Sequence, residues 1–198
     1  IEELSVRGGT QKQLLRLCQY TRTLGINFRI ITKSYNPKDG YTEFQEFKNR
    51  IEVVQLSSSD RLASFKGQWK IAQKIRKNKP DIISIHDNGF QFVIIFIKIH
   101  ALKAKIFWQI NDLPSCFRVG NKKGLKKRWS HIISRFIVKI AAKFVTVITV
   151  NVTKNRDRVI DKLKREALVL YCGIDQSLIE IETRIKQINS PEIRLLSI

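Results

Sequence analysis

The sequence predicts an α/β protein with a doubly wound, mostly parallel sheet. Runs of β-branched residues of strand length alternate with amphipathic helical stretches along the whole chain. The links between these elements are short, as expected where helices connect parallel strands. Polar residues gather where the strands end, and such sheets bind their ligands beyond the carboxyl ends of the strands.

Composition points to a basic protein with a substantial core. The 198 residues include 37 Lys and Arg against 17 Asp and Glu, for a net charge of +20, and 43% are hydrophobic. A polyanionic partner is expected, either nucleic acid, an anionic membrane surface or a phosphate-bearing substrate. The three cysteines have no metal-type spacing, so we expect no metal site and a reducing, cytoplasmic setting. No signal peptide is visible.

The first helix follows a glycine-paired turn, Arg7–Gln11. Leucines recur at helical spacing from Gln11 to Leu24, and Gly25 is a typical helix stop. A glycine pair at a helix N-terminus lets the backbone approach an anion such as a diphosphate. The alternative is a turn that joins strand to helix and binds nothing. The chain contains no Met, and its first six residues include Glu2 and Glu3 and are too polar for a buried strand, so we expect a preceding strand in a longer protein.

The next elements alternate in the same way. Ile26–Thr32 predicts a strand, Lys33–Arg50 a polar loop, and Ile51–Leu56 a short strand. A helix follows, whose apolar side contains Leu62, Phe65, Trp69, Ala72 and Ile75. It ends with the basic run Lys74–Lys79 and Pro80.

The second half continues the pattern. Asp81–His86 predicts a fully buried parallel strand, Phe90–Leu102 a buried helix that is too short to span a membrane at the ~20 residues required, and Ile106–Ile110 a strand. A basic amphipathic segment covers Lys122–Lys143. The remaining elements are strands at Phe144–Val150 and Ala167–Tyr171, a helix at Thr153–Leu163, a charged helical tail to Ser190, and a strand at Ile193–Ile198.

Five polar loops fall on one rim of this sheet. They are the glycine turn, His86-Asp87-Asn88, Asn111-Asp112, Asn151 and Gly173-Ile174-Asp175. Because the carboxyl ends of parallel strands lie at one edge, these loops are expected to surround one site.

Six motifs, in order, resemble the N-terminal half of a family 4 retaining glycosyltransferase of GT-B architecture. They are Gly8-Gly9-Thr10-Gln11, Pro80 to His86, Asn111-Asp112-Leu113-Pro114, Val147 to Val150 with Arg156 to Val159, Tyr171 to Asp175, and Arg194 to Ile198. The resemblance implies a Rossmann-like acceptor-side domain over residues 1–190, with its first strand missing. It also implies that residues 191–198 begin a C-terminal donor-binding domain.

The resemblance also implies roles for individual residues. Gly8, Gly9 and Thr10 would contact the diphosphate of a nucleotide-sugar donor, which is a substrate, so that no cofactor is expected. His86, Asp87 and Asn88 would bind the acceptor. The alternative for His86 is that its side chain hydrogen-bonds within its own loop and binds no ligand. Asn111 and Asp112 would be catalytic.

Asn111 departs from the family pattern. Many relatives carry a His-Asp pair where this chain has Asn111-Asp112. Asn can hydrogen-bond but cannot move a proton near neutral pH, so acid–base help is not expected at this position. The pair near the hinge reads Cys172-Gly173 in place of the usual Asn-Gly.

The segment Lys122–Lys143 has two interpretations. Large apolar residues recur at spacings of three and four while basic residues fill other positions, as in a basic helix that lies on an anionic membrane. The alternative is a helix that packs on the sheet by this apolar face.

The functional hypothesis is therefore half of a hexosyltransferase on the cytoplasmic side, peripheral to the membrane. It would use a nucleotide-sugar donor and a lipid-linked or polysaccharide acceptor, and the fragment alone would be inactive. The alternative is a non-catalytic basic α/β domain that binds nucleic acid or another polyanion. The sequence disfavours it, because aromatic residues are not interleaved with basic ones and no helix-turn-helix or zinc spacing is present.

Overall fold

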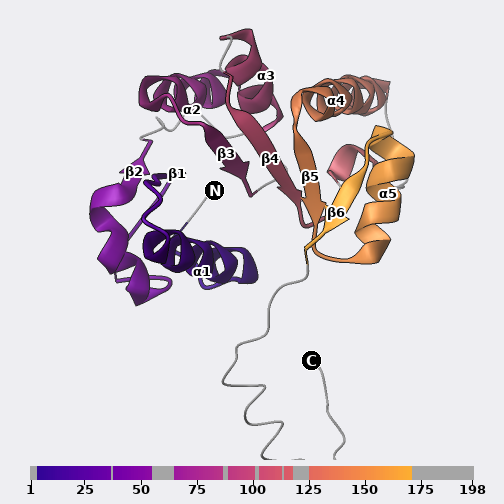
Figure 1. The fold of residues 1–198 in the computed structure, drawn as a ribbon. Coiled ribbons are helices and arrows are strands. Elements are labelled where there is room, and N and C mark those ends of the chain that lie inside the picture. Colours follow the sequence, from indigo (N-terminus) through magenta and orange to yellow (C-terminus); the bar gives the residue numbers. More distant parts are fainter. Residues whose placement is uncertain are drawn as a thin grey trace, which may run out of the picture.

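A computed structural model describes residues 4–36, 38–54, 65–86, 89–100, 103–112, 114–117 and 125–170 (Figure 1). The α-helices are α1 (Gly9–Thr23), α2 (Phe65–Asn78), α3 (Gln91–Ile99), α4 (Leu125–Phe144) and α5 (Thr153–Leu163). The strands are β1 (Ile30–Thr32), β2 (Ile51–Val53), β3 (Ile82–Ile85), β4 (Lys105–Ile110), β5 (Val147–Val150) and β6 (Ala167–Val169). Two 3₁₀ helices, η1 (Thr42–Arg50) and η2 (Ser115–Phe117), complete the described elements.

All strand pairs in the described part are parallel, which confirms the α/β class. β1 pairs with β2, and a second sheet has the order β3-β4-β5-β6. Within the second sheet Ile85 lies opposite Trp108, and Trp108 lies opposite Ile148. Because the strands run the same way, β3, β4 and β5 deliver the residues that follow them to one edge.

The larger core lies between the four-stranded sheet and its helices. α3 packs between α2 and α4 in one layer over the sheet, and α5 packs beside β5 and β6 (Figure 1). Trp108 and Ile106 are fully buried on β4, and Ile94 and Ile97 are fully buried on α3. Burial of aromatic and aliphatic side chains of this size is the main stabilising term of such a fold.

A smaller core joins α1 to β1 and η1, and it corrects one prediction. Residues 33–50 were expected to form a polar loop, but η1 occupies 42–50 and buries Phe44 and Phe47 against Leu14 and Leu15 of α1. Residues three apart lie above one another on a 3₁₀ helix, so both phenylalanines face the same core. The polar residues between them hid this pattern.

A second correction concerns β3. Asp81–His86 was expected to be buried throughout, but along β3 buried and exposed residues alternate, and Ile82 and Ser84 are exposed. The reason is that side chains along a strand point alternately to the two faces of the sheet. Ile83 and Ile85 point into the main core, whereas the side chains between them point to the other face.

The other predicted elements agree with the structure apart from their ends. α5 has the predicted bounds, and α1 ends one residue before Leu24, with Gly25 at φ +67° as predicted for a helix stop. β1 and β2 are shorter than predicted. The predicted tail helix and the strand at Ile193–Ile198 lie outside the described residues. Among the helices that the structure describes, none combines the length and hydropathy needed to cross a membrane.

Candidate functional site

Polar side chains from three strand ends and two helices meet at the carboxyl edge of the sheet. We call this group the polar network. Its members are Thr10 and Gln13 of α1, His86 after β3, Gln109 and Asn111 at the end of β4, Asn151 after β5, and Asn155 of α5. Except for the buried His86, its members are half-buried. They are therefore partly shielded from solvent but still accessible to a ligand.

Two side-chain hydrogen bonds attach the glycine turn and α1 to β4. Asn111 Nδ2 donates to Thr10 Oγ1 at 3.0 Å, and Gln109 Nε2 donates to Gln13 Oε1 at 2.8 Å. These partners are about a hundred positions apart in sequence. The glycine turn therefore lies beside the strand end that carries Asn111, as expected for polar loops that surround one site at the edge of the sheet.

The residues before α1 are held from the other side by the segment at 40–41. Arg7 Nε donates to the Gly40 carbonyl oxygen at 2.8 Å, and Tyr41 Oη donates to the Gly8 carbonyl oxygen at 3.5 Å. Gly40 has φ +74°, and a Cβ there would collide with the Leu4 carbonyl oxygen. A glycine is thus required at position 40 for this support.

The two glycines of the turn are not required by backbone conformation. Gly8 is the N-cap of α1 with φ −146° and ψ 166°, which any residue adopts, and no side chain caps the helix there. A Cβ added to Gly9 would meet nothing within 4 Å, whereas one on Gly8 would meet the mobile end of the Gln11 side chain. Gly9 therefore borders open space at a helix N-terminus, where backbone N–H groups favour an anion.

His86 closes the β3 end of the polar network. Its side chain is 6% exposed, and Nε2 lies 2.9 Å from Ser84 Oγ. Burial lowers the pKa of His86 to about 4, and the neighbouring Gln109 amide opposes this shift only in part. The imidazole is therefore neutral near pH 7. Its Nδ1 makes no hydrogen bond to the described residues.

Asn111 is fully engaged within the polar network. Its Nδ2 binds Thr10, its Oδ1 accepts from Gln109 at 3.0 Å, and its carbonyl oxygen accepts from Asn155 Nδ2 at 2.7 Å. Asn155 Nδ2 also donates to Asn151 Oδ1 at 3.1 Å. Asn111 thus ties β4 to α1 and α5. Asp112, the other residue predicted to be catalytic, is exposed.

The structure brings together some of the predicted residues and adds others. Gly8, Gly9, Thr10, His86, Asn111 and Asn151 lie at one edge, whereas Asp87, Asn88 and residues 173–175 lie outside the described residues. The sequence analysis missed Gln13, Gln109 and Asn155. Gln109 had a detectable signal, because it is the only uncharged polar residue in the strand Lys105–Ile110.

Two kinds of chemistry find no support in the described part of the chain. No group of three His, Cys, Asp or Glu side chains there could hold a metal ion. Cys18 and Cys116 are buried cysteines outside any disulfide, and burial raises the pKa of Cys18 to about 12. A thiol in that state is a poor nucleophile.

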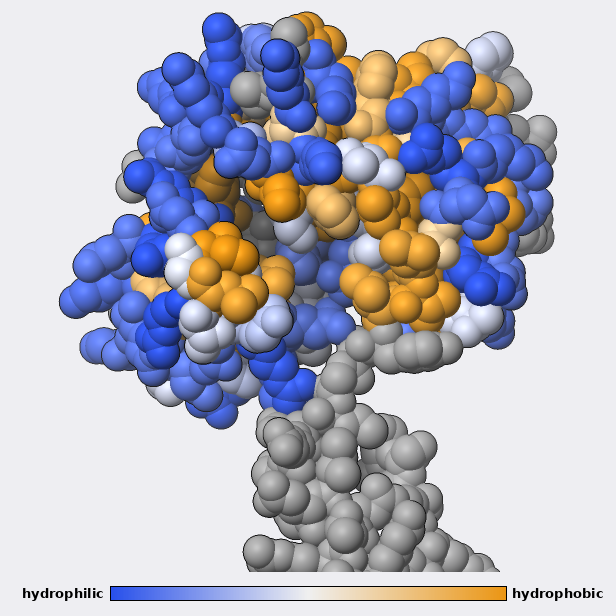
Figure 2. Space-filling model, viewed as in Figure 1, coloured by the Kyte–Doolittle hydropathy of each residue, from blue (hydrophilic) through white to orange (hydrophobic). Residues whose placement is uncertain are grey.

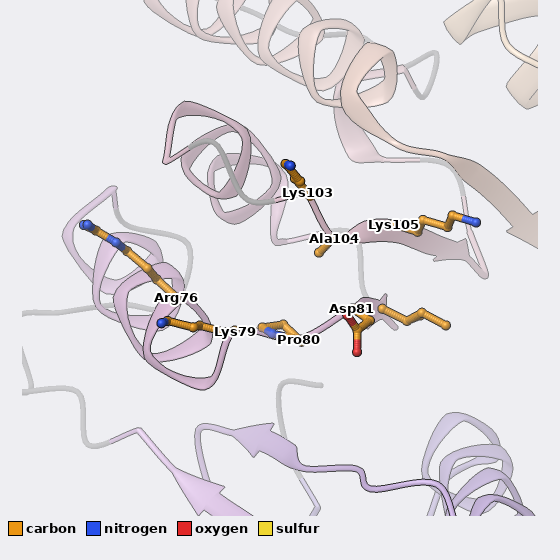
Figure 3. Close-up of a pocket in the computed structure, with 8 residues that line it drawn as sticks. Arg76, Lys79, Pro80, Asp81, Lys103, Ala104 and Lys105 are labelled. Atoms are coloured by element: carbon orange, nitrogen blue, oxygen red, sulfur yellow. The ribbon is translucent and has the colours of Figure 1, made fainter.

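A cavity of about 660 Å³ lies at the opposite edge, at the amino ends of β3 and β4 (Figure 3). Its lining includes Arg76, Lys79, Lys103 and Lys105 with a single acid, Asp81. Figure 3 shows that the basic side chains point in different directions rather than toward one point. Because ligands of parallel sheets bind at the carboxyl edge, the polar network is the better candidate site.

Comparison with known proteins agrees with this fold. The family model described as Glycosyltransferase Family 4 matches residues 7–178. No protein in a search of curated proteins matches the chain. A solved UDP-N-acetylglucosamine 2-epimerase is similar, with a TM-score of 0.51 and 12% identity over 83% of this chain and 46% of that one. At this identity the likeness shows the fold alone.

Two further solved structures are similar over most of this chain. A UDP-N-acetylglucosamine 2-epimerase from Rickettsia bellii has a TM-score of 0.48 and 16% identity, over 96% of this chain and 49% of that one. A glycosyltransferase from Rickettsia africae ESF-5 has a TM-score of 0.49 and 13% identity, over 96% and 50%. The chain spans about half the length of the solved structures that it matches.

Proposed function

Since the chain belongs to glycosyltransferase family 4, we propose that its protein transfers a hexose from a nucleotide-sugar donor to an acceptor, with retention of configuration. The described residues would form the acceptor side of the active site. No cofactor is involved in this proposal. The donor is a substrate, and most of its contacts would come from chain that follows these residues.

One observation carries the proposal. The glycine turn opens onto free space at Gly9 and is hydrogen-bonded through Thr10 to Asn111 at the carboxyl edge. A diphosphate could therefore approach the backbone N–H groups at the start of α1 while the sugar lies over the polar network. The helix N-terminus favours the negative charge of the diphosphate.

The polar network would position groups rather than move protons. Asn111 cannot act as an acid or base near neutral pH, and both ends of its amide are occupied by Thr10 and Gln109. We propose that Asn111 fixes the glycine turn, and that Asp112, which is exposed, is the remaining candidate for a direct role. The neutral His86 would supply a hydrogen bond to an acceptor hydroxyl through Nδ1, which is buried, so the acceptor would have to displace the groups that cover this atom.

The acceptor would be a saccharide or a lipid-linked saccharide, with Asp87 and Asn88 completing its site. A polysaccharide-building enzyme on the cytoplasmic face of the membrane is consistent with the +20 charge, because anionic lipid attracts basic protein surfaces. Nucleic acid remains a poor candidate partner, because the family match covers most of the chain.

The test is nucleoside diphosphate binding by the full-length protein. Gly9→Val should fold, because a Cβ at Gly9 meets nothing within 4 Å, yet its methyl groups would fill the space that the diphosphate needs. We expect affinity for a nucleoside diphosphate to fall at least about tenfold, which corresponds to about 1.4 kcal/mol. Isothermal titration calorimetry measures this directly.

Gly89→Val is the matched control. Gly89 also has open space around a Cβ and lacks a positive φ, but it precedes α3 rather than α1. Its substitution should leave nucleoside diphosphate affinity unchanged. Equal affinity for the Gly9→Val variant and the unchanged protein would refute a donor role for the glycine turn.

A further inference from the structure

α4 turns its large apolar side chains away from the protein. Trp129, Ile132, Ile133 and Phe136 are all exposed, with 62% of Trp129 and 65% of Phe136 accessible to solvent. Their spacing of three, four and seven places them on one face of the helix. We call these four residues the outward stripe. Single exposed apolar residues are ordinary, but a contiguous group on one face marks an interaction surface.

The opposite face of α4 makes the contact with the core. Val138, Ala141 and Ala142 are buried there and belong to the main core cluster. These small side chains let α4 pack closely against its neighbours. The interpretation that the apolar face of this segment packs on the protein is therefore wrong for the four residues of the outward stripe, whereas Ile137 and Ile140 are half-buried.

The charge of α4 is complementary to an anionic surface. The helix contains six Lys and Arg residues and no acidic residue. Lys139 and Lys143 are exposed. At helical spacing Lys139 lies beside the outward stripe, and Lys143, seven residues after Phe136, lies at its carboxyl end. Hydrophobic side chains bordered by lysines fit an interface between lipid headgroups and acyl chains.

A second exposed apolar group lies in the same helix layer. Phe65 and Trp69 of α2 pack edge-on against Phe96 of α3, with ring centroids 4.8 Å and 4.9 Å away, and Phe65 is largely exposed. α3 packs between α2 and α4. In Figure 2 hydrophobic side chains reach the upper surface of the molecule, where these helices lie, among hydrophilic ones.

We propose that the outward stripe of α4 docks on an anionic lipid bilayer and lies within its interface. The aromatic and aliphatic side chains enter the headgroup region, and Lys139 and Lys143 contact lipid phosphates. This inference gives the proposed function a membrane-facing surface. It can be tested without donor or acceptor, so its failure would leave the glycosyltransferase proposal untouched.

A second copy of the chain fits this face less well. Two α4 helices packed stripe to stripe would bring the exposed Lys139 and Lys143 of both copies into one interface, with no acidic residue in either helix to compensate. Like charges across an interface oppose association. An anionic bilayer instead attracts each basic residue near its surface.

The experiment measures co-sedimentation of the full-length protein with vesicles of phosphatidylcholine, with or without phosphatidylglycerol in equal part. We expect binding to the anionic vesicles that is much stronger than binding to the neutral ones. Trp129→Ser with Phe136→Ser should reduce the partition coefficient at least about tenfold, because two large apolar side chains leave the interface. Lys139→Gln with Lys143→Gln should reduce it severalfold on anionic vesicles only.

The matched control is Leu17→Ser with Tyr20→Ser, which removes exposed apolar side chains from α1 and should leave the partition coefficient unchanged. Circular dichroism checks that each variant is folded. Three results would overturn the proposal: no vesicle binding, an equal loss of binding in the control, or a concentration-dependent dimer that the Trp129 and Phe136 substitutions abolish.

Discussion

The polar network and the outward stripe depart from ordinary globular structure in opposite ways. In the polar network, polar side chains such as Gln109 and Asn111 are partly enclosed and bonded to one another. In the outward stripe, Trp129 and Phe136 are exposed to water although a core could have received them. Each arrangement costs free energy in the isolated chain.

The difference between them indicates what each region binds. Enclosed polar groups at the carboxyl edge suit a ligand with many hydroxyl and phosphate groups. Exposed apolar groups bordered by lysines suit an extended lipid surface. Under the two proposals, one face of the chain would bind a ligand with hydroxyl and phosphate groups. The other face would hold the protein at the lipid surface.

The largest expected effect is on the free energy of unfolding, and it comes from comparing substitutions on the two faces of α4. Val138→Asp places a carboxylate at a position that is 3% exposed and should lower the free energy of unfolding by about 4 kcal/mol. Ile132→Asp on the outward stripe should change it by less than about 0.5 kcal/mol. Urea unfolding measures both. Equal losses would mean that the outward stripe is packed against protein.

The next effect tests the burial of His86. The pKa of His86 falls from 6.5 to about 4 on folding, so between these pH values the unfolded chain binds a proton that the folded chain does not. The contribution of His86 to the free energy of unfolding is therefore fully present above pH 6.5 and is lost as pH falls toward 4. The total loss should be about 3 kcal/mol.

The His86→Gln variant isolates this contribution. Urea unfolding of both proteins across the pH range gives the slope of stability against pH for each. The variant should show a shallower slope below pH 6.5, because glutamine does not titrate. Identical slopes would show that His86 is not the group responsible.

A smaller effect is expected when the polar network is cut at Asn111. Asn111→Ala removes the hydrogen bonds to Thr10 and Gln109 and should cost about 1–2 kcal/mol of stability. The exposed Arg22–Glu46 ion pair provides the comparison, since Arg22→Gln should cost less than about 1 kcal/mol. Thermal unfolding ranks the two variants, and the opposite order would mean that the polar network is not an energetic unit.

Much of the fold could be predicted from local sequence patterns. Alternation of β-branched runs with amphipathic helices identified the parallel sheet, and Gly25 marked the end of α1. The 3₁₀ helices η1 and η2 were missed. In η1, Phe44 and Phe47 have the spacing of one 3₁₀ turn within a polar segment. The periodicity of α4 located the outward stripe but could not tell which face meets the sheet. The face that packs on the core is the one with the smaller residues Ala141 and Ala142, because small side chains allow close packing.

The site was harder to predict in its details than in its place. Strand ends in a parallel sheet must share an edge, so the convergence of Thr10, His86 and Asn111 follows from topology. The partners Gln13 and Asn155 lie inside helices, where a single polar residue resembles any solvated position. Their inward orientation depends on where α1 and α5 lie relative to β4 and β5. Residues distant in the sequence set these positions, so the local pattern does not reveal them.

The central claim is that the glycine turn at the carboxyl edge receives a diphosphate. Hydrogen–deuterium exchange of the full-length protein, with and without a nucleoside diphosphate, tests it most directly. We predict that the ligand slows amide exchange in the first turns of α1, from Gly9 to Leu14, and leaves the amino edge at Lys103–Lys105 unchanged. Protection at the amino edge with none in α1 would contradict the account.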